Sequence, residues 1–237
     1  MPRRGSETLL TLVRHGETDW NRERRIQGSS DVPLNEVGVA QAGAAGAALA
    51  DAGYAAVYAS PQSRAFETAR IISEAIGVPL SGTFTELRER SFGAAEGMTG
   101  PEIGARFPHG IPDEEARDDV VRRSLPVLHR IARRHPGGQV LVVTHGAVIS
   151  SLVRHLSGGT LPKPGEGILN LSLTHLVHTR EGLELGEFNV PSHDAQQIAD
   201  SVLLASQPSD QDVASNAAPD ATSSSTASSA AADPAQV

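Results

Sequence analysis

Two histidines in this chain, His15 and His145, each follow a short apolar run and each precede a glycine. The first run is residues 9–13, with Arg14 between it and the histidine, and the second is residues 140–144. Buried parallel strands read as continuous runs of β-branched and leucine side chains, and ligands of open α/β sheets bind beyond their carboxyl ends. If the two strands are neighbours, both histidines lie at one edge of the sheet. Two facing histidines with an arginine beside them suit a phosphoryl group, because arginine presents a forked set of donors to phosphate oxygens.

The residues around His15 favour a functional histidine over the commoner structural or solvent-exposed one. Arg14 precedes it and Gly16 follows it, and a glycine permits the backbone to approach a ligand closely. Asn21, six residues on, offers a further hydrogen-bond donor.

Strand and helix signals alternate along the chain, as an α/β fold requires. Ser60 and Pro61 predict a capped helix start, and Gly53 and Gly77 predict helix ends. The predicted strands are 9–13, 55–59, 78–80, 140–144, 168–178 and 183–189, the last two joined by a turn at 180–182, and the predicted helices are 34–52, 60–76, 113–135 and 147–156. This order predicts a three-layer α/β sandwich, with a mainly parallel central sheet and helices on both faces.

Composition bounds the class of protein. The chain of 237 residues has no cysteine, which excludes disulfides, thiolate metal sites and a cysteine nucleophile. No apolar run approaches the roughly 18–20 residues that span a membrane, and residues 1–7 lack a signal-peptide stretch, so a cytoplasmic location is expected. The net charge is −8, and six of the 28 acidic residues follow Pro191, where no Lys or Arg occurs. Neither nucleic acid nor a membrane surface is therefore expected as a partner.

The C-terminal segment 207–237 consists mostly of Ala, Ser, Asp and Pro. Such a composition buries too little apolar surface to offset the entropy of ordering, so we predict a disordered tail. Residues 198–204 are compatible with a last helical turn or two. The division predicted from these signals is one domain over 1–206 followed by the tail.

Five segments, in order, resemble the motifs of the histidine phosphatase superfamily, the phosphoglycerate-mutase-like proteins. The first, Leu-Val-Arg-His-Gly-Glu-Thr at 12–18, is moderately specific by itself, and all five in this order are a strong match. The other four are Asn21 with Arg25, Gln27, Gly28, Asp31, Pro33, Leu34, Gly38, Gln41 and Ala42; residues 60–69; residues 87–93 with Glu96 and Gly97; and residues 142–146. The resemblance covers about residues 9–156 and implies the phosphoglycerate-mutase-like fold with a small cap at about 94–119.

The resemblance also implies a mechanism. His15 would attack phosphorus and become a phosphohistidine, so it must be neutral, with its other ring nitrogen donating to an acceptor such as a backbone carbonyl. Arg14, Arg64 and His145 would surround the phosphoryl oxygens. Asn21, Gln27, Gly28 and Gly146 are the expected substrate-binding residues. No metal or other cofactor is implied, and no spacing of Asp, Glu or His argues for a metal site.

Glu89 is the candidate general acid, which would protonate the leaving oxygen and then activate water. Glu86 is a competitor, and the family pattern favours Glu89. The alternative interpretation of Glu89 is an exposed partner of Arg88 or Arg90.

Several other residues have two interpretations. Arg24, Arg25 and Arg90 either contact substrate or pair with acids, and Trp20 either lines the pocket or packs. His109 belongs to the expected cap, and the remaining histidines are expected to be solvated: His129, His135, His155, His175, His178 and His193.

The resemblance leaves the reaction open between hydrolysis and transfer. A mutase generally carries a longer insertion with extra basic residues after the acid block, whereas residues 98–117 are short and contain no Lys. This favours a metal-independent phosphatase acting on a small phosphorylated metabolite, with phosphoglycerate-mutase-type transfer and a non-catalytic phosphate-binding module as alternatives. Two departures from the phosphatase pattern, Ala95 and the segment at 110–113, leave the substrate open, and Ala95 would widen the pocket if it faced it. Dimerisation is common in such folds, but the sequence carries no evidence for it.

Overall fold

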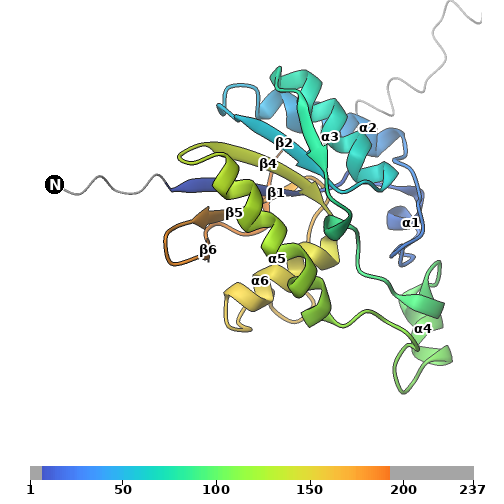
Figure 1. Ribbon diagram of the computed structural model, residues 1–237. Coiled ribbons are helices and arrows are strands. Elements are labelled where there is room, and N and C mark those ends of the chain that lie inside the picture. Colours follow the sequence, from blue (N-terminus) through green and yellow to red (C-terminus); the bar gives the residue numbers. More distant parts are fainter. Residues whose placement is uncertain (1–6, 193–237) are drawn as a thin grey trace, which may run out of the picture. The chain divides into compact units, whose positions relative to one another are not determined.

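A seven-stranded sheet forms the centre of the described part of the chain, which is residues 7–192 of a computed structural model (Figure 1). Its order is β3-β2-β4-β1-β5-β6, with β7 pairing with β5. The strands β3, β2, β4 and β1 are mutually parallel, and β5 pairs antiparallel with β1, β6 and β7. The bounds are Thr8–Arg14 for β1, Ala56–Ala59 for β2, Leu80–Thr83 for β3, Gln139–Thr144 for β4, Ser172–His178 for β5, Leu183–Leu185 for β6 and Val190–Pro191 for β7.

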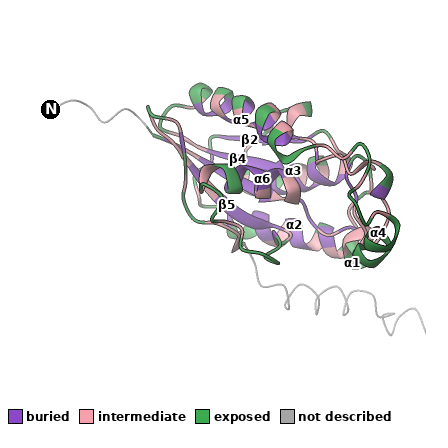
Figure 2. Ribbon diagram, turned by 90° about the horizontal axis from the view of Figure 1, so that it is seen from below, coloured by how far each residue is buried: buried purple, intermediate pink, exposed green. Residues whose placement is uncertain are grey.

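Helices cover both faces of this sheet. Helices α2 (Glu36–Ala48) and α3 (Ser63–Ile76) pack on one face, and α5 (Arg117–Arg134) and α6 (Gly146–Leu156) pack on the other. Figure 2 shows the buried residues concentrated on the strands and on the helix sides that meet them. The short helices α1 (Asp19–Arg22) and α4 (Gly100–Arg106), and the 3₁₀ turns Thr85–Leu87 and Gly93–Ala95, lie in the connecting segments.

Successive residues of the central strands point into the two apolar clusters in turn. In β1, Leu12 belongs to the cluster under α5 and α6, whereas Val13 belongs to the cluster under α2 and α3. In β4, Val142 and Val143 divide in the same way, and all four side chains are fully buried. Because both faces of each strand are covered, the strands read as uninterrupted apolar runs. The predicted three-layer α/β architecture is confirmed.

The predicted start of α3 is wrong. The helix begins at Ser63 after Gln62, with no side-chain cap, and Pro61 lies in the bend before it. The Ser60 hydroxyl accepts from the Gln62 N–H at 3.3 Å, before the helix begins, and it is also hydrogen-bonded to Nε2 of His145 at 2.8 Å. Ser60 thus contributes a contact across the sheet edge in addition to a local one, and it does not cap α3.

Other predicted boundaries shift by a few residues. Helix α2 is shorter than predicted at both ends, because the Asn35 side chain caps its start by accepting from the Gly38 N–H, and it ends at Ala48, before the predicted stop at Gly53. Strand β3 begins at Leu80, since the Val78 N–H donates to the Ser73 carbonyl and so closes α3 after Gly77. The remaining shifts are at 113–135, where α5 begins at Arg117; at 168–178, where β5 begins at Ser172; and at 183–189, which yields β6 and leaves β7 just beyond it. The segments 198–204 and 207–237, for which a helical turn and a disordered tail are predicted, lie outside the described residues.

Helix α4 is an element that the sequence interpretation omitted. Thr99 and Glu102 form a capping box at its start, in which the Glu102 side chain accepts from the Thr99 N–H and hydroxyl. The pattern Thr-x-x-Glu is visible in the sequence and would have predicted this start. Figure 1 places α4 on a segment that leaves the sheet after β3 and returns at α5. In residues 7–192, no helix combines the length and apolar character needed to cross a bilayer.

Two glycines allow the loop after β1 to cross the start of α2. A Cβ on Gly16 would lie 2.6 Å from the Gly38 carbonyl oxygen, and a Cβ on Gly38 would lie 2.1 Å from the Glu17 carbonyl oxygen. The backbone of α2 thus lies too close to Gly16 for any side chain there. This crossing fixes the segment that carries His15.

We expect Gly38→Ala to lower the free energy of unfolding by about 1–3 kcal/mol, because the new methyl group meets backbone that must move. Gly43→Ala in the same helix is the matched control, since nothing lies within 4 Å of its added Cβ. That control should stabilise the protein by about 0.5–1 kcal/mol through helix propensity. Urea unfolding of the two variants measures both effects, and equal stabilities would contradict the crossing.

Candidate active site

The carboxyl ends of β1 and β4 bring the two histidines together, as predicted. Arg14 lies opposite Thr144 in the parallel pairing, and the His15 N–H donates to the Thr144 carbonyl at 3.0 Å. The ring centroids of His15 and His145 are 5.2 Å apart, with an interplanar angle of 61°. His15 opens onto a pocket of about 330 Å³.

His15 is held in one tautomer by its own loop. Its Nδ1 lies 2.7 Å from the Gly16 carbonyl oxygen, and a carbonyl only accepts, so Nδ1 carries the hydrogen. Nε2 is then the nitrogen with a lone pair, which confirms the expected backbone acceptor. Burial, with the charges of Arg14 and Arg64, holds the pKa of His15 well below its ordinary value. The imidazole is therefore neutral at neutral pH, as a nucleophile must be.

His145 lies behind His15 and is fully buried, outside the pocket lining. Its Nε2 is hydrogen-bonded to Ser60, while its Nδ1 is buried without a hydrogen-bond partner among residues 7–192. Burial, followed by Arg64 and His15, lowers its pKa well below the ordinary value. A neutral histidine with one uncommitted ring nitrogen results.

Arg14 lines the pocket and is anchored by the segment that precedes β5 in the chain. Its Nη1 donates to the Ile168 carbonyl, and its Nε is buried with no partner in the described part of the chain. Gly146, the first residue of α6, lies against it, because a Cβ there would be 3.4 Å from Arg14 Nε. The pocket thus has a fixed cation beside His15.

Arg64 does not line the pocket. It is fully buried in α3, and its Nη1 and Nη2 donate to the carbonyls of Ser30 at 2.8 Å and Gly28 at 3.0 Å. Its Nε has no partner among the described residues. Arg64 therefore acts on the two histidines through its charge, and it also fixes the 28–30 loop.

Glu96 anchors the same loop from the opposite side. Its carboxylate accepts from the backbone N–H groups of Ser29 at 2.7 Å, Ser30 at 3.0 Å and Phe92 at 3.2 Å. Gly28 has a φ of +54° and leaves room for this side chain, since a Cβ there would lie 2.2 Å from Glu96 Oε1. Burial by itself would raise the pKa of Glu96, but the hydrogen bonds outweigh it and lower the pKa.

The predicted substrate-binding residues Asn21, Gln27, Gly28 and Gly146 all line the pocket. Asn21 Oδ1 accepts from the N–H and hydroxyl of Thr18 in a capping box, so its amino group is the end that can donate to a ligand. Gln27 is almost completely buried, and its Oε1 has no partner in the described structure.

Glu89 lines the pocket, whereas its competitor Glu86 does not. The Glu89 carboxylate accepts from the backbone N–H groups of Arg90 at 2.9 Å and Ala147 at 3.3 Å. Glu86 instead pairs with Arg130 at 3.6 Å and is half-exposed. The alternative that Glu89 is an exposed ion-pair partner is therefore wrong.

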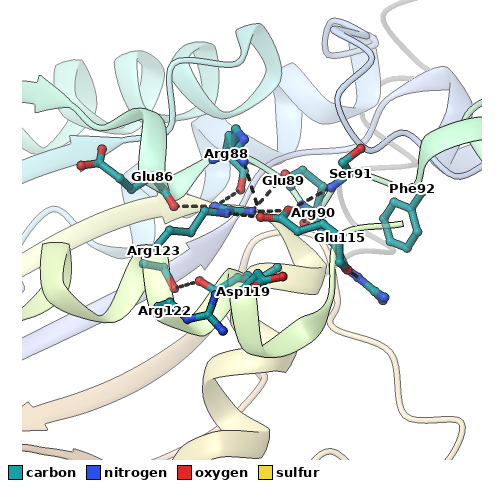
Figure 3. A network of polar contacts seen from close by, with 12 residues as sticks. Glu86, Arg88, Glu89, Arg90, Ser91, Phe92, Glu115, Asp119, Arg122 and Arg123 are labelled. Atoms are coloured by element: carbon teal, nitrogen blue, oxygen red, sulfur yellow. Dashed lines mark hydrogen bonds and ion pairs between the residues drawn. The ribbon is translucent and has the colours of Figure 1, made fainter. Parts of the chain in front are cut away.

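Arg123 on α5 holds the backbone that carries Glu89, as Figure 3 shows. Its guanidinium donates to the carbonyls of Glu86, Arg88 and Glu89 and to the carboxylate of Glu115. Burial would raise the pKa of Glu115, but the hydrogen bond from Arg123 and its charge lower it. This partly buried ion pair and the carbonyl contacts of Arg123 thus fix the position of Glu89 relative to α5.

Of the residues that had two interpretations, some line the pocket and others pack or pair outside it. Arg25 lines the pocket while pairing with Glu23 at 2.7 Å, and Arg90 pairs with Glu114 at 3.0 Å. Trp20 packs against Gly97 outside the pocket lining. Three others do not line it: Arg24 and His109 are exposed, and Ala95 is fully buried, so Ala95 does not widen it.

The sequence interpretation missed several residues that the structure brings to this site. Ser60 and Glu96 were quoted only as parts of motifs, and Arg117, Ser150 and Glu166 line the pocket without having been singled out. Ser150 lies four residues after Gly146, a spacing that shares a helix face and was a usable signal. The others depend on contacts between distant segments.

Comparison with known proteins agrees with this geometry. A family model described as the histidine phosphatase superfamily (branch 1) matches residues 10–191. Curated relatives carry names of phosphatases and of phosphoglycerate mutase-like proteins. The chain is 35% identical over 187 residues to PhoE of Bacillus subtilis, named as an uncharacterised phosphatase, covering 78% of this chain and 96% of that protein.

Two further similarities carry substrate names. The chain is 35% identical over 188 residues to a metal-independent phosphoserine phosphatase of Arabidopsis thaliana, covering 73% of this chain and 77% of the relative. A solved mycobacterial glucosyl-3-phosphoglycerate phosphatase superposes with a TM-score of 0.69 at 29% identity, covering 77% of this chain and 99% of that one.

The lowered pKa values of the two histidines predict a pH dependence. In the folded protein both rings should still be neutral at the pH where histidines of the unfolded chain, which titrate near about 6.5, become protonated. The unfolded state then binds more protons below that pH, so stability falls as the pH drops through about 6.5. Nitrogen NMR of the imidazole rings, assigned with His15→Ala and His145→Gln, measures this, with the urea-unfolded protein as the control. Titration of either ring in the folded protein at the same pH as in the unfolded protein would contradict this prediction.

Glu96→Gln tests the anchor of the 28–30 loop. We expect the free energy of unfolding at neutral pH to fall by about 1 kcal/mol, because a charged acceptor of several N–H groups is lost. A carboxyl with a lowered folded pKa stabilises above its unfolded value and loses this effect as the pH falls through the folded value, so the difference should shrink as the pH falls below the ordinary value of about 4.3. Urea unfolding at neutral pH and over a series of acidic pH values measures it, with Glu181→Gln in an exposed turn as the control. A difference independent of pH would show that the carboxylate charge is not responsible.

Proposed function

The chain belongs to branch 1 of the histidine phosphatase superfamily, and from this premise we propose that it hydrolyses phosphomonoesters through a phosphohistidine at His15. One observation carries the proposal. His15 opens onto a pocket, its Nδ1 hydrogen is committed to the Gly16 carbonyl, and burial and two arginines keep it neutral. A neutral imidazole with a free Nε2 lone pair is a nucleophile for phosphorus.

In the first step, Nε2 of His15 forms the bond to phosphorus as the bond to the ester oxygen breaks. Glu89, in its protonated form, gives its proton to the departing oxygen, so the product is a free alcohol. Its place in the pocket lining, held by two backbone N–H groups and by Arg123, suits this role.

In the second step, water attacks the phosphohistidine. Glu89, now a carboxylate, accepts a proton from the water as the new bond to phosphorus forms and the bond to Nε2 breaks. Inorganic phosphate leaves, and both His15 and the protonated Glu89 are restored. The nucleophile, the acid and base, and the cations all come from the chain, so neither step requires a metal ion or another cofactor.

Charge that develops on the phosphoryl oxygens is stabilised by groups that are already in place. Arg14 lines the pocket, and Asn21 can donate from its amino group. Ser60 accepts from the Gln62 N–H at 3.3 Å, so its hydroxyl can donate to Nε2 of His145, which leaves a hydrogen on the unpartnered Nδ1. The Nε–H of Arg14, which is also buried without a partner among the described residues, is the donor that belongs to the pocket lining, whereas the Nδ1–H of His145 and the Nε–H of Arg64 lie outside that lining and act on the phosphoryl group through their charge distribution.

Water is the proposed acceptor of the phosphoryl group. The relatives include phosphatases and phosphoglycerate mutase-like proteins, so transfer to a phosphoglycerate is the alternative. The short segment 98–117, without lysine, favours hydrolysis of a small phosphorylated metabolite.

Release of nitrophenol from p-nitrophenyl phosphate in the presence of EDTA tests the proposal. We expect turnover by the natural chain and a loss of at least about 10³-fold in His15→Ala, because the nucleophile is gone. Glu89→Gln should give a burst of nitrophenol followed by slow turnover, since an activated leaving group needs little acid and hydrolysis of the phosphohistidine still needs the base. His109→Ala, an exposed histidine outside the pocket, is the control.

Other outcomes assign other functions. Isomerisation of a phosphoglycerate without phosphate release would indicate a mutase. Phosphate binding by calorimetry without turnover of any ester would indicate a binding module. Turnover that persists in His15→Ala would exclude the proposed nucleophile.

A further inference from the structure

A second pocket, of about 500 Å³, adjoins the one at His15. The two pockets share Arg117, Ser150 and Glu166 in their linings, so a ligand can extend from one to the other. The second pocket is also lined by Arg154 and Lys163, and we call it the Arg154 pocket.

One face of α6 runs through both pockets. Gly146 and Ser150 line the pocket at His15, and Ser150 and Arg154 line the Arg154 pocket. These residues are spaced by four, so they share a helix face. A helix rises 1.5 Å per residue, which places Ser150 about 6 Å and Arg154 about 12 Å beyond Gly146 along the axis. The distance between the two pockets can therefore be estimated from the positions of these residues along the helix axis.

The Arg154 pocket carries excess positive charge. Arg117, Arg154 and Lys163 form no ion pair with a described carboxylate, whereas Glu166 is the one acidic residue in the described lining. The Glu166 carboxylate accepts from the Lys163 backbone N–H at 2.9 Å. Glu114, which lies near Arg117, pairs with Arg90. Three cations with one carboxylate among them repel one another more than they are compensated, and an anion relieves that repulsion.

Arg117 joins the two pockets. Its Nη1 donates to the Ser150 hydroxyl at 3.3 Å, about one helical turn from Gly146. Burial, with the charges of Arg90 and Arg154, lowers its pKa. Arg117 thus lies between the phosphoryl site and the other two cations.

We propose that the Arg154 pocket binds a second anionic group of the substrate, a phosphate or a carboxylate, held about 6–12 Å from the transferred phosphoryl group. This inference rests on the proposed phosphatase function and specifies its substrate class. The substrate is an elongated molecule with an anion at each end. In a compact one, such as a short diol bisphosphate, the second anion would not reach Arg154 and Lys163.

Substrates that differ only at the far end test the proposal. We compare hexyl phosphate, hexanediol bisphosphate and carboxypentyl phosphate, with ethanediol bisphosphate as the short control. For the natural chain we expect kcat/KM to be about 10- to 100-fold higher for hexanediol bisphosphate than for hexyl phosphate, through a lower KM, because a charge-assisted contact is added. The carboxylate compound distinguishes a preference for phosphate from one for any anion. Ethanediol bisphosphate should show no such gain.

The double variant Arg154→Gln with Lys163→Gln should remove the preference, bringing the ratio of the two kcat/KM values to within about 3-fold of one, with the change in KM rather than kcat. Arg134→Gln with Arg122→Gln makes the same change in charge outside both pockets and should keep the ratio. If the ratio of the two kcat/KM values fell equally in both double variants, the preference would arise from the net charge of the protein, and the proposed site would be wrong.

Binding separates this inference from the proposed function. Calorimetry with His15→Ala measures the affinity for both hexyl compounds without turnover. Equal affinities, or hydrolysis of both esters at equal kcat/KM, would overturn the second anion site and leave the phosphatase function in place. Absence of hydrolysis by the natural chain, with tighter binding of the bisphosphate by His15→Ala, would overturn the function and keep the site.

Discussion

The parallel pairing of β1 with β4 is the constraint on which the site depends. The register sets Arg14 opposite Thr144, and the His15 N–H continues the ladder by donating to the Thr144 carbonyl. Each strand then ends in a histidine at the same edge of the sheet, with the rings 5.2 Å apart. A slip of one residue would turn one histidine toward the opposite helix layer, because successive strand residues face opposite sides. The two apolar clusters that bury alternate residues of both strands therefore also fix the distance between the histidines.

Two arginines, Arg64 fully buried and Arg14 partly buried, give this edge its electrostatic character. Arg14 and Arg64 lie beside two buried histidines, and both the burial and the positive charges disfavour the imidazolium form. The arginines are held by backbone carbonyls, those of Ile168, Gly28 and Ser30, and not by dedicated carboxylates. A carbonyl carries no net charge, so these contacts hold the guanidinium groups without neutralising them, which suits a site for a dianionic phosphoryl group.

The surrounding loops carry the remaining groups and are fixed from several directions. Glu96 holds the 28–30 loop that in turn holds Arg64, and Arg123 holds the backbone of Glu89. Helix α6 contributes to both pockets, from Gly146 near the phosphoryl site to Arg154 at the far end. In the proposed function, the reacting groups are thus concentrated where strands end, and the proposed selectivity for the rest of the substrate belongs to a helix face and to the loop after it.

The sequence by itself determined the strands of the core, the order of elements and the two histidines with Arg14, because these depend on local patterns: apolar runs, a glycine after each histidine, and helix ends such as Gly77. Motif similarity added Glu89 over Glu86. Only the tertiary structure decided that Ser60 hydrogen-bonds His145 and does not cap α3, that Arg64 points to two loop carbonyls, and that Arg117 and Arg154 extend the pocket. These contacts join segments far apart in the chain, so no short-range pattern records them. Where a polar side chain has both local and distant partners within reach, the packing around it determines which contacts it makes.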